Sequence, residues 1–366
     1  MKYPIRVLQL VTYMGRGGLE TMLMNYYRHM DHTKVQFDFL THRDFEADYD
    51  KEIVAVGGQI YHLSKLNPIS LSYKKELDEF FNTHKEYKVV HSHLDCMSGI
   101  PLKEAKKCHV PYRIAHAHSS NQTKDMKYPL KLIFKRNITK DANYLFACGD
   151  QAGKWMFNTD NFKVLNNAID AKAYSFNFIA RDSIREEFHI PNDSFVIGHV
   201  GRFMNPKNHT FIIDIFNQFH KDHPNSYLML VGEGELKTSI QDKVRTLGLE
   251  DYVIFAGLRS DVNEVLQAMD VFLFPSLYEG LPVSIIEAQA AGLPIVASTG
   301  VTRETDITGN VTFLSLDRPA EVWARRILDI CSDFERVDMT EAVRNAGYDI
   351  KQTAQWLQNF YLSKAL

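Results

Sequence analysis

Short apolar runs alternate with longer amphipathic stretches through the first half of the chain. This pattern is typical of a parallel sheet covered by helices, because a strand buried on both faces reads as a continuous apolar run. We therefore expect a Rossmann-like domain with helices between its strands. The strands are predicted at residues 5–12, 35–41, 59–63, 88–93, 112–118, 144–148 and 162–165.

A second series of apolar runs follows a pause in this alternation. Residues 168–193 are polar and aromatic without a long apolar run, which indicates a connection between domains. Beyond them, strands are predicted at residues 195–201, 227–232, 253–257, 271–275 and 294–298. Each run ends in Gly, Pro or Ser, so loops should gather at the carboxyl edge of the sheet, where open α/β folds bind their ligands.

The chain is thus predicted to be an α/β protein with two Rossmann-like domains that face each other across a cleft. Its 366 residues, 45% of them apolar, exceed one comfortable core and can fill two. We expect an N-terminal domain at residues 1–168 and a C-terminal domain at residues 169–347. Residues 348–366 predict an amphipathic helix that could pack back on the first domain.

Composition argues against several partners and compartments. The net charge of -3 provides no general attraction for nucleic acid. No uncharged stretch approaches the roughly 20 residues that a membrane-spanning helix needs, and the first residues lack the cleavage site of a signal peptide. The cysteines form no CxxC pair and are too few for a disulfide framework, so we expect a reducing, cytoplasmic location. They are Cys96, Cys108, Cys148 and Cys331.

Residues 275–288 carry the sharpest chemical signal in the sequence. They leave a predicted strand, turn at Gly280 and start a helix near Pro282, where proline fits the first helical turn. Free backbone N–H groups and the positive end of the helix would then face the ligand, as suits a diphosphate. The carboxylates of Glu279 and Glu287 can each accept two hydrogen bonds, which suits the paired hydroxyls of a ribose or a hexose.

Residues 198–208 supply two cations. A predicted strand ends at Gly201 and is followed by Arg202 and, around a turn, by Lys207. Arginine presents a planar fork and lysine a mobile point charge, and both commonly bind diphosphates. Fixed cations at this place would stabilise the charge that grows on a departing diphosphate without the help of a metal ion.

A glycine turn follows the first predicted strand, at residues 15–18. Glycines permit a close approach of the backbone to a ligand. Such a turn serves as a packing device at least as often as it forms a binding loop.

Together these segments resemble retaining glycosyltransferase family 4, whose members have the GT-B fold. The resemblance spans nearly the whole chain, and its most specific part is the E-x7-E motif from Glu279 to Glu287. It implies a metal-independent hexosyltransferase that retains anomeric configuration and needs no cofactor beside its nucleotide diphosphate sugar, with UDP as the expected nucleotide. The implied acceptor is a glycan or a lipid-linked sugar in the synthesis of a cell-surface polysaccharide such as a capsule. Other matching segments are Gly17-Gly18-Leu19-Glu20, Val89-Val90-His91-Ser92-His93, Gly201-Arg202 with Lys207, and Gly232-Glu233-Gly234-Glu235.

The resemblance also assigns residues to roles. Arg202 and Lys207 would bind the diphosphate, Glu287 the ribose and Glu279 the donor sugar, and the turn with Gly17 and Gly18 would lie at the reaction centre. The expected catalytic residues are His118, Glu279, Arg202 and Lys207. The expected donor-binding residues are Gly17, Gly18, Arg202, Lys207, Leu258, Glu279, Gly280, Leu281, Val283 and Glu287.

The histidine of the first domain is less sharply placed. The family's histidine falls at the end of the predicted strand 112–118, and matching the strand ends favours His118 over His116. Residues two apart share a strand face, so the pattern alone does not separate them. A histidine with only a structural role is the third interpretation. The implied role is contact with the transferred sugar and with the developing charge.

A basic stretch at residues 103–140 raises the question of membrane binding. It holds ten basic residues against Glu104 and Asp125. Residues 129–138 mix apolar and cationic side chains at near-helical spacing, as interfacial helices do. We expect peripheral contact with the anionic inner face of the plasma membrane, against the alternative of an ordinary solvated face. The basic residues are Lys103, Lys106, Lys107, Arg113, Lys124, Lys127, Lys131, Lys135, Arg136 and Lys140.

Three other functions remain open from the sequence. The pairs His91/His93 and His116/His118 could ligate zinc in a metal-dependent hydrolase, although no acidic ligand follows at a diagnostic spacing. A nucleotide-sugar binder that lacks transfer activity is another, because fold alone does not establish chemistry, although both glutamates, Arg202 and Lys207 are present. A nucleotide-sugar epimerase of similar fold is the closer alternative.

Overall fold

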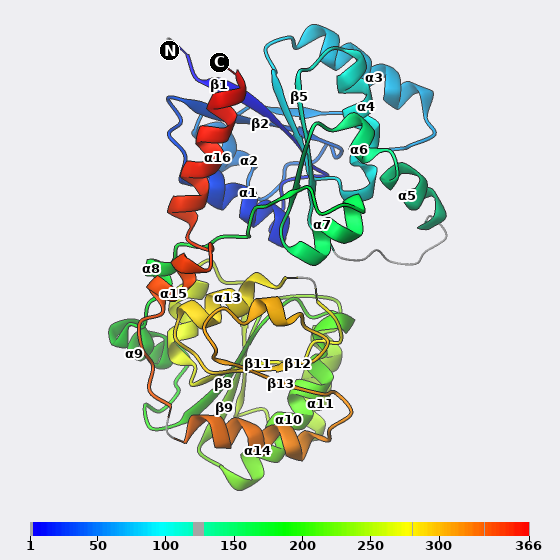
Figure 1. Cartoon of the computed structure of the whole chain (residues 1–366). Coiled ribbons are helices and arrows are strands. Elements are labelled where there is room, and N and C mark those ends of the chain that lie inside the picture. The colour runs from blue at the N-terminus through cyan, green and yellow to red at the C-terminus, as the bar shows by residue number, and fades with distance from the viewer. Residues whose placement is uncertain (1–2, 120–127, 280, 333, 366) are drawn as a thin grey trace. The chain divides into compact units, whose positions relative to one another are not determined.

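The computed structural model describes residues 3–119, 128–279, 281–332 and 334–365, and the chain divides into two compact units (Figure 1). Unit 1 comprises residues 1–168 and 350–366, and unit 2 comprises residues 169–349. The last helix of the chain therefore belongs with the first unit. No helix among the described residues is both long enough and apolar enough to cross a membrane.

Unit 1 is built on a parallel sheet that has seven strands among the described residues, in the order β3-β2-β1-β4-β5-β6-β7. The chain fills one side of the sheet from β1 and then returns to start the other side with β4, as doubly wound folds do. In the sheet register Gln9 lies opposite His91, and His91 lies opposite Ile114. The strands are β1 (Ile5–Leu10), β2 (Val35–Thr41), β3 (Ile60–His62), β4 (Val89–Ser92), β5 (Tyr112–Ala117), β6 (Tyr144–Ala147) and β7 (Lys163–Val164).

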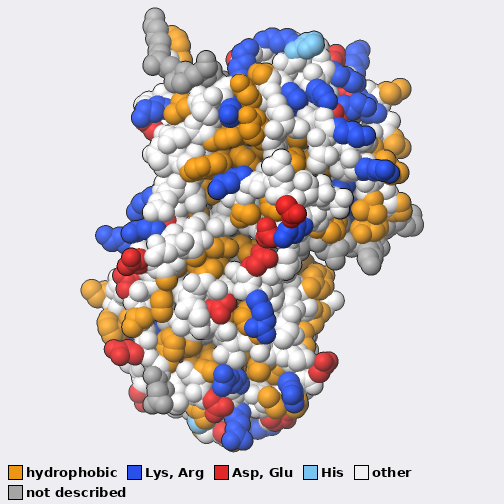
Figure 2. Space-filling view, viewed as in Figure 1, with side chains coloured by type: hydrophobic (Ala, Val, Ile, Leu, Met, Phe, Trp, Pro, Cys, Tyr) orange, Lys and Arg blue, Asp and Glu red, His pale blue; other side chains and the backbone are white. Residues whose placement is uncertain are grey.

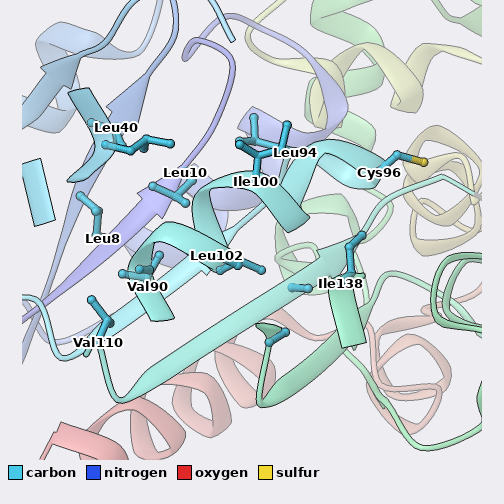
Figure 3. Packing of buried hydrophobic residues seen from close by; sticks show 14 of the residues in the cluster. Leu8, Leu10, Leu40, Val90, Leu94, Cys96, Ile100, Leu102, Val110 and Ile138 are labelled. Carbon is cyan, nitrogen blue, oxygen red and sulfur yellow. The ribbon is translucent and has the colours of Figure 1, made fainter. Parts of the chain in front are cut away.

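Helices cover both faces of this sheet. Successive side chains of a strand point to opposite faces, so each strand contributes to two separate cores. Leu8, Leu10 and Val90 point to one face and pack with Ile100 and Leu102 of α4 (Figure 3). The other face packs against α1 and α16. The helical segments of unit 1 are α1 (Gly18–Arg28), α2 (Asp50–Ala55), α3 (Leu71–Thr83), η1 (Asp95–Ser98), α4 (Gly99–Lys107), α5 (Tyr128–Lys135), α6 (Ile138–Asp141), α7 (Asp150–Phe157) and α16 (Ile350–Ala365).

The C-terminal helix α16 is held on unit 1 by an apolar stripe. Ala354, Leu357 and Tyr361 recur at spacings of three and four residues, so they lie on one face of the helix, and all three are buried. This face lies in the same core as Val7 and Val89. The helix therefore completes one side of the first sheet.

Unit 2 repeats the arrangement with a parallel sheet that has six strands in the described part of the chain, in the order β10-β9-β8-β11-β12-β13. The strands are β8 (Phe195–Val200), β9 (Ser226–Val231), β10 (Val253–Gly257), β11 (Val271–Phe274), β12 (Ile295–Ser298) and β13 (Val311–Leu314). The helical segments are α8 (Ala171–Tyr174), α9 (Phe178–Glu187), η2 (Asn205–Lys207), α10 (His209–Asp222), α11 (Lys237–Thr246), α12 (Val262–Val265), η3 (Leu266–Ala268), α13 (Val283–Ala290), η4 (Arg303–Thr305), α14 (Ala320–Cys331) and α15 (Thr340–Asn345).

The twelve strands predicted from the sequence are confirmed, with ends that shift by at most two residues. One strand escaped prediction: β13 is a four-residue edge strand whose side chains beyond Val311 are only partly buried, so its apolar run is weak. The interpretation of residues 168–193 as a plain connection is wrong. This segment contains α8 and α9 and belongs to unit 2. Helix α9 packs on this unit through its two buried residues, Ile184 and Arg185, although few of its other residues are apolar.

Candidate active site

The carboxyl end of β8 delivers the first group of expected site residues in unit 2. The chain leaves the strand at Val200, passes Gly201 and forms the short helix η2, which ends with Lys207. Asn208 then takes a left-handed backbone conformation, with a φ of 57°, and its side-chain amide donates to the carbonyl of Pro275 at 3.1 Å. This turn aims the Lys207 side chain back along Gly201, whose missing Cβ would lie 3.2 Å from Lys207 Cδ.

Lys207 meets Glu279, which comes from the loop after β11. The Lys207 Nζ atom lies 2.8 Å from a carboxylate oxygen of Glu279, and both side chains are largely buried, 17% and 15% exposed. The ammonium also lies over the ring of Phe274, 4.7 Å from its centroid. Two cross-links align the loops: Leu277 N–H donates to the Pro206 carbonyl at 2.8 Å, and Glu279 N–H donates to the Gly300 carbonyl at 3.2 Å. The structure therefore brings these two predicted residues into direct contact.

Backbone segments approach each other closely around this group. Gly232, at the end of β9, has a φ of 138°, and a Cβ placed on it would lie 2.3 Å from the carbonyl oxygen of Gly201. Gly234 has a φ of 159°, and its Cβ would lie 2.4 Å from the carbonyl oxygen of Phe203. Only glycine fits these places, because the neighbouring atoms are backbone and cannot rotate away. These glycines belong to the Gly232-Glu233-Gly234-Glu235 segment that the sequence singled out.

The second glutamate of the E-x7-E motif stands on helix α13. Pro282 is the N-cap of this helix, which starts at Val283. The predicted helix start near Pro282 is therefore confirmed to within one residue. Glu287 accepts a hydrogen bond of 2.8 Å from the hydroxyl of Tyr174 in α8. Burial raises the pKa of Glu287 above its ordinary value, and the hydrogen bond from Tyr174 opposes that rise.

Sequence reasoning missed Tyr174. The tyrosine lies 113 positions before its partner, in a segment interpreted as a connection, so no spacing pattern links the two residues. A signal was present only in the aromatic character of that segment. Burial raises the pKa of Tyr174 well above its ordinary value, and the negative charge of Glu287 adds to this rise, so the hydroxyl stays protonated and donates.

The remaining expected residues of unit 2 lie at the edges of this group. Arg202 is exposed, and its nearest recorded charge partner is Glu235, with a nitrogen–oxygen distance of 3.5 Å. Leu258 follows β10 and is 65% exposed. Leu281 and Val283 flank Pro282 and are partly buried. Gly280 lies outside the described residues.

In unit 1 the glycine turn precedes helix α1. Gly17 is the N-cap residue, with extended backbone angles, and the helix starts at Gly18. Both glycines are exposed, and a Cβ placed on Gly18 would meet no atom within 4 Å, whereas one on Gly17 would meet the carboxylate of Glu20. Gly18 therefore leaves open space in front of the helix start, and Gly17 leaves room for Glu20 to fold back on the turn.

The histidines of unit 1 form one row across the sheet. Gln9 on β1, His91 on β4 and His116 on β5 point to the sheet face that α16 covers, because they share the alternation of Val7, Val89 and Ile114. His93 and His118 follow two residues after His91 and His116 and continue the same row. We call the four histidines His91, His93, His116 and His118 the histidine row.

Hydrogen bonds tie this row to neighbouring elements. His91 Nδ1 lies 2.7 Å from the hydroxyl of Tyr361 in α16. His93 lies 2.9 Å from His118, between Nδ1 and Nε2, and its own Nε2 lies 2.9 Å from Gln9 Oε1. Burial and the neighbouring imidazoles hold the pKa of His91, His93 and His116 well below the ordinary value, and burial lowers that of His118 to about 3. The row is therefore neutral at physiological pH.

A zinc site does not fit the geometry of this row. Ring nitrogens of His91, His93 and His116 do lie within 4.8 Å of one another. However, the rings of His91 and His116 are stacked, 5.2 Å apart and 9° from parallel, so their in-plane lone pairs point along separate planes instead of converging on one ion. His93 also has both ring nitrogens engaged in hydrogen bonds. The geometry thus argues against the hydrolase alternative.

The structure separates the two candidate histidines by position. His116 lies inside β5 and is 1% exposed, whereas His118 follows the end of the strand and is only partly buried. The Asp95 carboxylate accepts the backbone N–H of His118 at 3.0 Å and the hydroxyl of Ser119 at 3.2 Å. Of the two, His118 is therefore the less buried and the nearer to the carboxyl edge of the sheet.

Comparison with known proteins identifies the family. Residues 194–333 match the family model described as "Glycosyl transferases group 1". The putative glycosyltransferase EpsF of Bacillus subtilis is 35% identical over 370 residues, which cover 97% of this chain and 96% of that protein. CapH of Staphylococcus aureus, a capsular polysaccharide biosynthesis glycosyltransferase, is 24% identical and covers 99% of this chain and 100% of its own length.

A solved structure shows the same fold. The crystal structure of HepE from Anabaena in complex with UDP and glucose superimposes with a TM-score of 0.79, at 17% identity, and covers 98% of this chain and 100% of that one. This agreement confirms the expected GT-B architecture of two α/β domains. Family membership also favours glycosyl transfer over the epimerase and hydrolase alternatives. Similar to EpsF along nearly its whole length, the chain belongs to the group 1 glycosyltransferases and has their GT-B fold.

Proposed function

We propose that this protein is a retaining hexosyltransferase that moves a sugar from a nucleotide diphosphate, UDP in the first instance, to a glycan or a lipid-linked acceptor in the synthesis of a cell-surface polysaccharide. The observation that carries the proposal is the contact between Lys207 and Glu279 at the carboxyl edge of the second sheet. It puts a cation for the diphosphate beside a carboxylate for sugar hydroxyls. The printed names of the relatives support the biological setting, since CapH serves capsular polysaccharide biosynthesis.

The chemistry of the unit 2 group fits departure of a nucleoside diphosphate. Negative charge grows on the diphosphate as its bond to the sugar breaks, and a cation already held in place stabilises that charge without reorganisation. Lys207 is such a cation, since its side chain is largely buried and anchored over Phe274. Arg202 is exposed and adds a planar fork that suits phosphate oxygens. In this proposal no metal ion takes part in the transfer.

The ends of the donor are assigned to the two glutamates. Glu287, oriented by Tyr174, accepts hydrogen bonds from the two ribose hydroxyls. Glu279 accepts hydrogen bonds from hydroxyls of the donor sugar. UDP as the nucleotide is supported by the complexes of HepE, whose crystal structure contains UDP and glucose. In unit 1, His118 is assigned to contact with the transferred sugar, and the turn with Gly17 and Gly18 to the reaction centre.

The test is a donor screen followed by product analysis. Purified protein is heated with a panel of UDP-, GDP- and dTDP-sugars, and the true donor should raise the melting temperature because it binds only the folded chain. The selected donor is then incubated with glycan and lipid-linked acceptors, and the anomeric proton coupling in the product reports retention. An inverted anomeric centre would exclude the retaining mechanism, and release of a free epimerised nucleotide sugar without acceptor would exclude transfer.

We expect Tyr174→Phe to weaken donor binding selectively. Loss of the hydroxyl removes a hydrogen bond to a carboxylate, which should raise KM for the nucleotide sugar about tenfold and leave kcat nearly unchanged. The pKa of Glu287 should rise further, because the hydrogen bond that lowered it is gone. Only the ionised carboxylate can accept hydrogen bonds from both ribose hydroxyls. As the solution is acidified, the variant should therefore lose donor affinity at a higher pH than the native protein does.

The measurement is KM for the donor from pH 5 to pH 8 in the variant and the native protein. Tyr252→Phe is the matched control, because Tyr252 is also a partly buried tyrosine of unit 2. Unchanged donor KM across this range in Tyr174→Phe would remove Tyr174 from the site.

We also propose that helix α5 attaches the protein to anionic membranes at the cytoplasmic face. Phe134 packs on the unit 1 core, while Leu132 and Ile133 are 39% and 60% exposed. Figure 2 shows apolar side chains at the edge of unit 1 where Figure 1 places α5, with a group of Lys and Arg side chains above them. The two lysines of this helix, Lys131 and Lys135, are partly exposed. Exposed apolar side chains beside cationic ones on one helix are what an anionic interface binds.

The structure reduces the number of charges that the basic stretch can offer. Lys107 pairs with Glu104 and Lys106 with Asp141, so carboxylates balance these two charges. The Arg113 guanidinium is held at backbone carbonyls, including that of Asp141 at 2.7 Å. Lys124 and Lys127 lie outside the described residues. The expected attraction is therefore weaker than the sequence count suggests, and the apolar residues of α5 become the more important part.

Replacing Leu132 and Ile133 together with glutamate should abolish flotation with vesicles that contain anionic phospholipid. Two new negative charges on the docking face would oppose both apolar insertion and electrostatic attraction. Val54→Glu is the matched control, because Val54 lies on the surface of α2 with the same 60% exposure as Ile133. Failure of the native protein to float at low salt, or equal flotation of the double variant, would contradict the proposal.

A further inference from the structure

We propose that His93, held by Gln9, is a positioning residue that fixes the tautomer of His118 and leaves its Nδ1 atom as a hydrogen-bond acceptor for a hydroxyl of the bound sugar. This inference rests on the proposed function, since it deepens the part assigned to His118. It concerns two residues to which the resemblance assigned no role in transfer. One line of hydrogen bonds runs from Gln9 through His93 to His118, across three adjacent strands of the sheet and the residues that follow them.

The line starts at Gln9 in the middle of the first sheet. Its Oε1 atom can only accept, so the partner nitrogen, Nε2 of His93, 2.9 Å away, must carry the hydrogen. His93 is 5% exposed and neutral, and a neutral imidazole carries one hydrogen only. Its Nδ1 atom is therefore an acceptor.

The second step passes from His93 to His118. The Nε2 atom of His118 lies 2.9 Å from the accepting Nδ1 of His93, so it must be the donor. His118 is neutral as well, which leaves its Nδ1 atom with a lone pair and no hydrogen. That Nδ1 atom is buried and has no hydrogen-bond partner among the described residues, so it lacks a donor, which a hydroxyl of a sugar bound against the ring would supply.

The position of His118 is fixed from two sides. Its backbone N–H donates to the Asp95 carboxylate at 3.0 Å, and its ring packs on the ring of His116 with centroids 4.1 Å apart. The backbone anchor sets where the residue sits, the packing limits ring rotation, and the bond to His93 selects which nitrogen carries the hydrogen. Of these three constraints only the last one controls the chemical character of Nδ1, so removing it should change the contact with the sugar without moving the residue.

The test uses Gln9→Leu, which removes the acceptor and keeps a side chain of similar size in the buried position. Protein labelled with ¹⁵N-histidine is examined by long-range ¹H–¹⁵N NMR, and the His118 signals are assigned from their loss in His118→Gln. The native protein should show His118 with its hydrogen on Nε2, and Gln9→Leu should shift this tautomer equilibrium. With the confirmed donor and acceptor, kcat should fall about tenfold, the rate equivalent of one lost hydrogen bond.

Two further variants separate positioning from a loss of stability. Gln36→Leu removes another buried glutamine of the same sheet. Its side chain donates to the Val56 carbonyl at 2.9 Å and makes no hydrogen bond to the histidine row among the described residues. This variant should lower the melting temperature without changing the His118 tautomer or kcat. Gln9→Glu, which can still accept from His93, should restore the native tautomer and much of kcat.

The outcomes distinguish this inference from the proposed function. A native His118 that carries its hydrogen on Nδ1 overturns the inference even if transfer is observed. A tautomer and a kcat that Gln9→Leu leaves unchanged overturn it as well. If no donor is turned over by the native protein, the proposed function fails, and the NMR result still reports whether His93 controls the tautomer of His118.

Discussion

Replacing Lys207 with alanine is expected to lower kcat/KM for the nucleotide sugar about 100- to 1,000-fold, the usual loss for one fixed group that stabilises transition-state charge. The reason is the place of this ammonium: it is largely buried, lies over the Phe274 ring and touches the Glu279 carboxylate. Its removal also takes away the cation that pairs with Glu279, so this carboxylate, which we propose binds the donor sugar, should lose its fixed orientation. Steady-state rates with saturating acceptor measure the effect.

The control for this variant is Lys243→Ala. Lys243 is also a partly buried lysine of unit 2, with its side chain 25% exposed, and it pairs with Asp214 at 2.6 Å. Both variants lose one ion pair, so their melting temperatures should fall by similar amounts, whereas only Lys207→Ala should lose transfer. Rates within twofold of the native protein in Lys207→Ala would show that Lys207 does not act on the departing diphosphate.

The second large effect is expected for Gly232→Ala, which should lower the free energy of unfolding of unit 2 by about 3 kcal/mol. Two penalties combine at this position. A φ of 138° is a conformation that an L side chain rarely adopts, and the new Cβ would lie 2.3 Å from the carbonyl oxygen of Gly201. Relief of the clash would displace the end of β8, from which Arg202 and Lys207 follow, so transfer should also fall in the protein that remains folded.

Gly248→Ala separates the two penalties. Gly248 has a φ of 68°, and a Cβ on it would meet nothing within 4 Å, so only the conformational penalty of about 1 kcal/mol applies. Trp323 is fully buried in unit 2, and the other two tryptophans, Trp155 and Trp356, lie in unit 1. Urea unfolding followed by fluorescence in a Trp155→Phe, Trp356→Phe background therefore reports unit 2 alone. Equal losses for the two glycine variants would contradict the close approach of β8 and β9.

The sequence by itself determined most of the architecture. Continuous apolar runs predicted twelve strands of two parallel sheets, because burial on both faces leaves a strand little choice of side chain. The same pattern failed where burial is partial, at the edge strand β13 and at α9, which is held by few apolar residues. The helix start after Pro282 was legible because proline has few acceptable places in a helix.

Part of the candidate site was also predicted from the sequence. The motif from Glu279 to Glu287 and the pair Arg202 and Lys207 follow strand ends, and in a parallel sheet all such ends lie at one edge. Topology thus converts a sequence position into a place in space. The strand ends thus predict which loops of unit 2 and which strand of unit 1 carry the expected residues, but they do not tell which side chains touch.

Only the tertiary structure decided the contacts between side chains that are distant in the sequence. It paired Lys207 with Glu279, placed Tyr174 against Glu287, and joined His118 through His93 to Gln9. The physical reason is that strand alternation and helix periodicity fix the direction of a side chain within its own element, whereas its partner depends on the order and register in which elements pack. Hydrogen bonds and ion pairs act over about 3 Å, so their formation depends on that packing and not on local sequence.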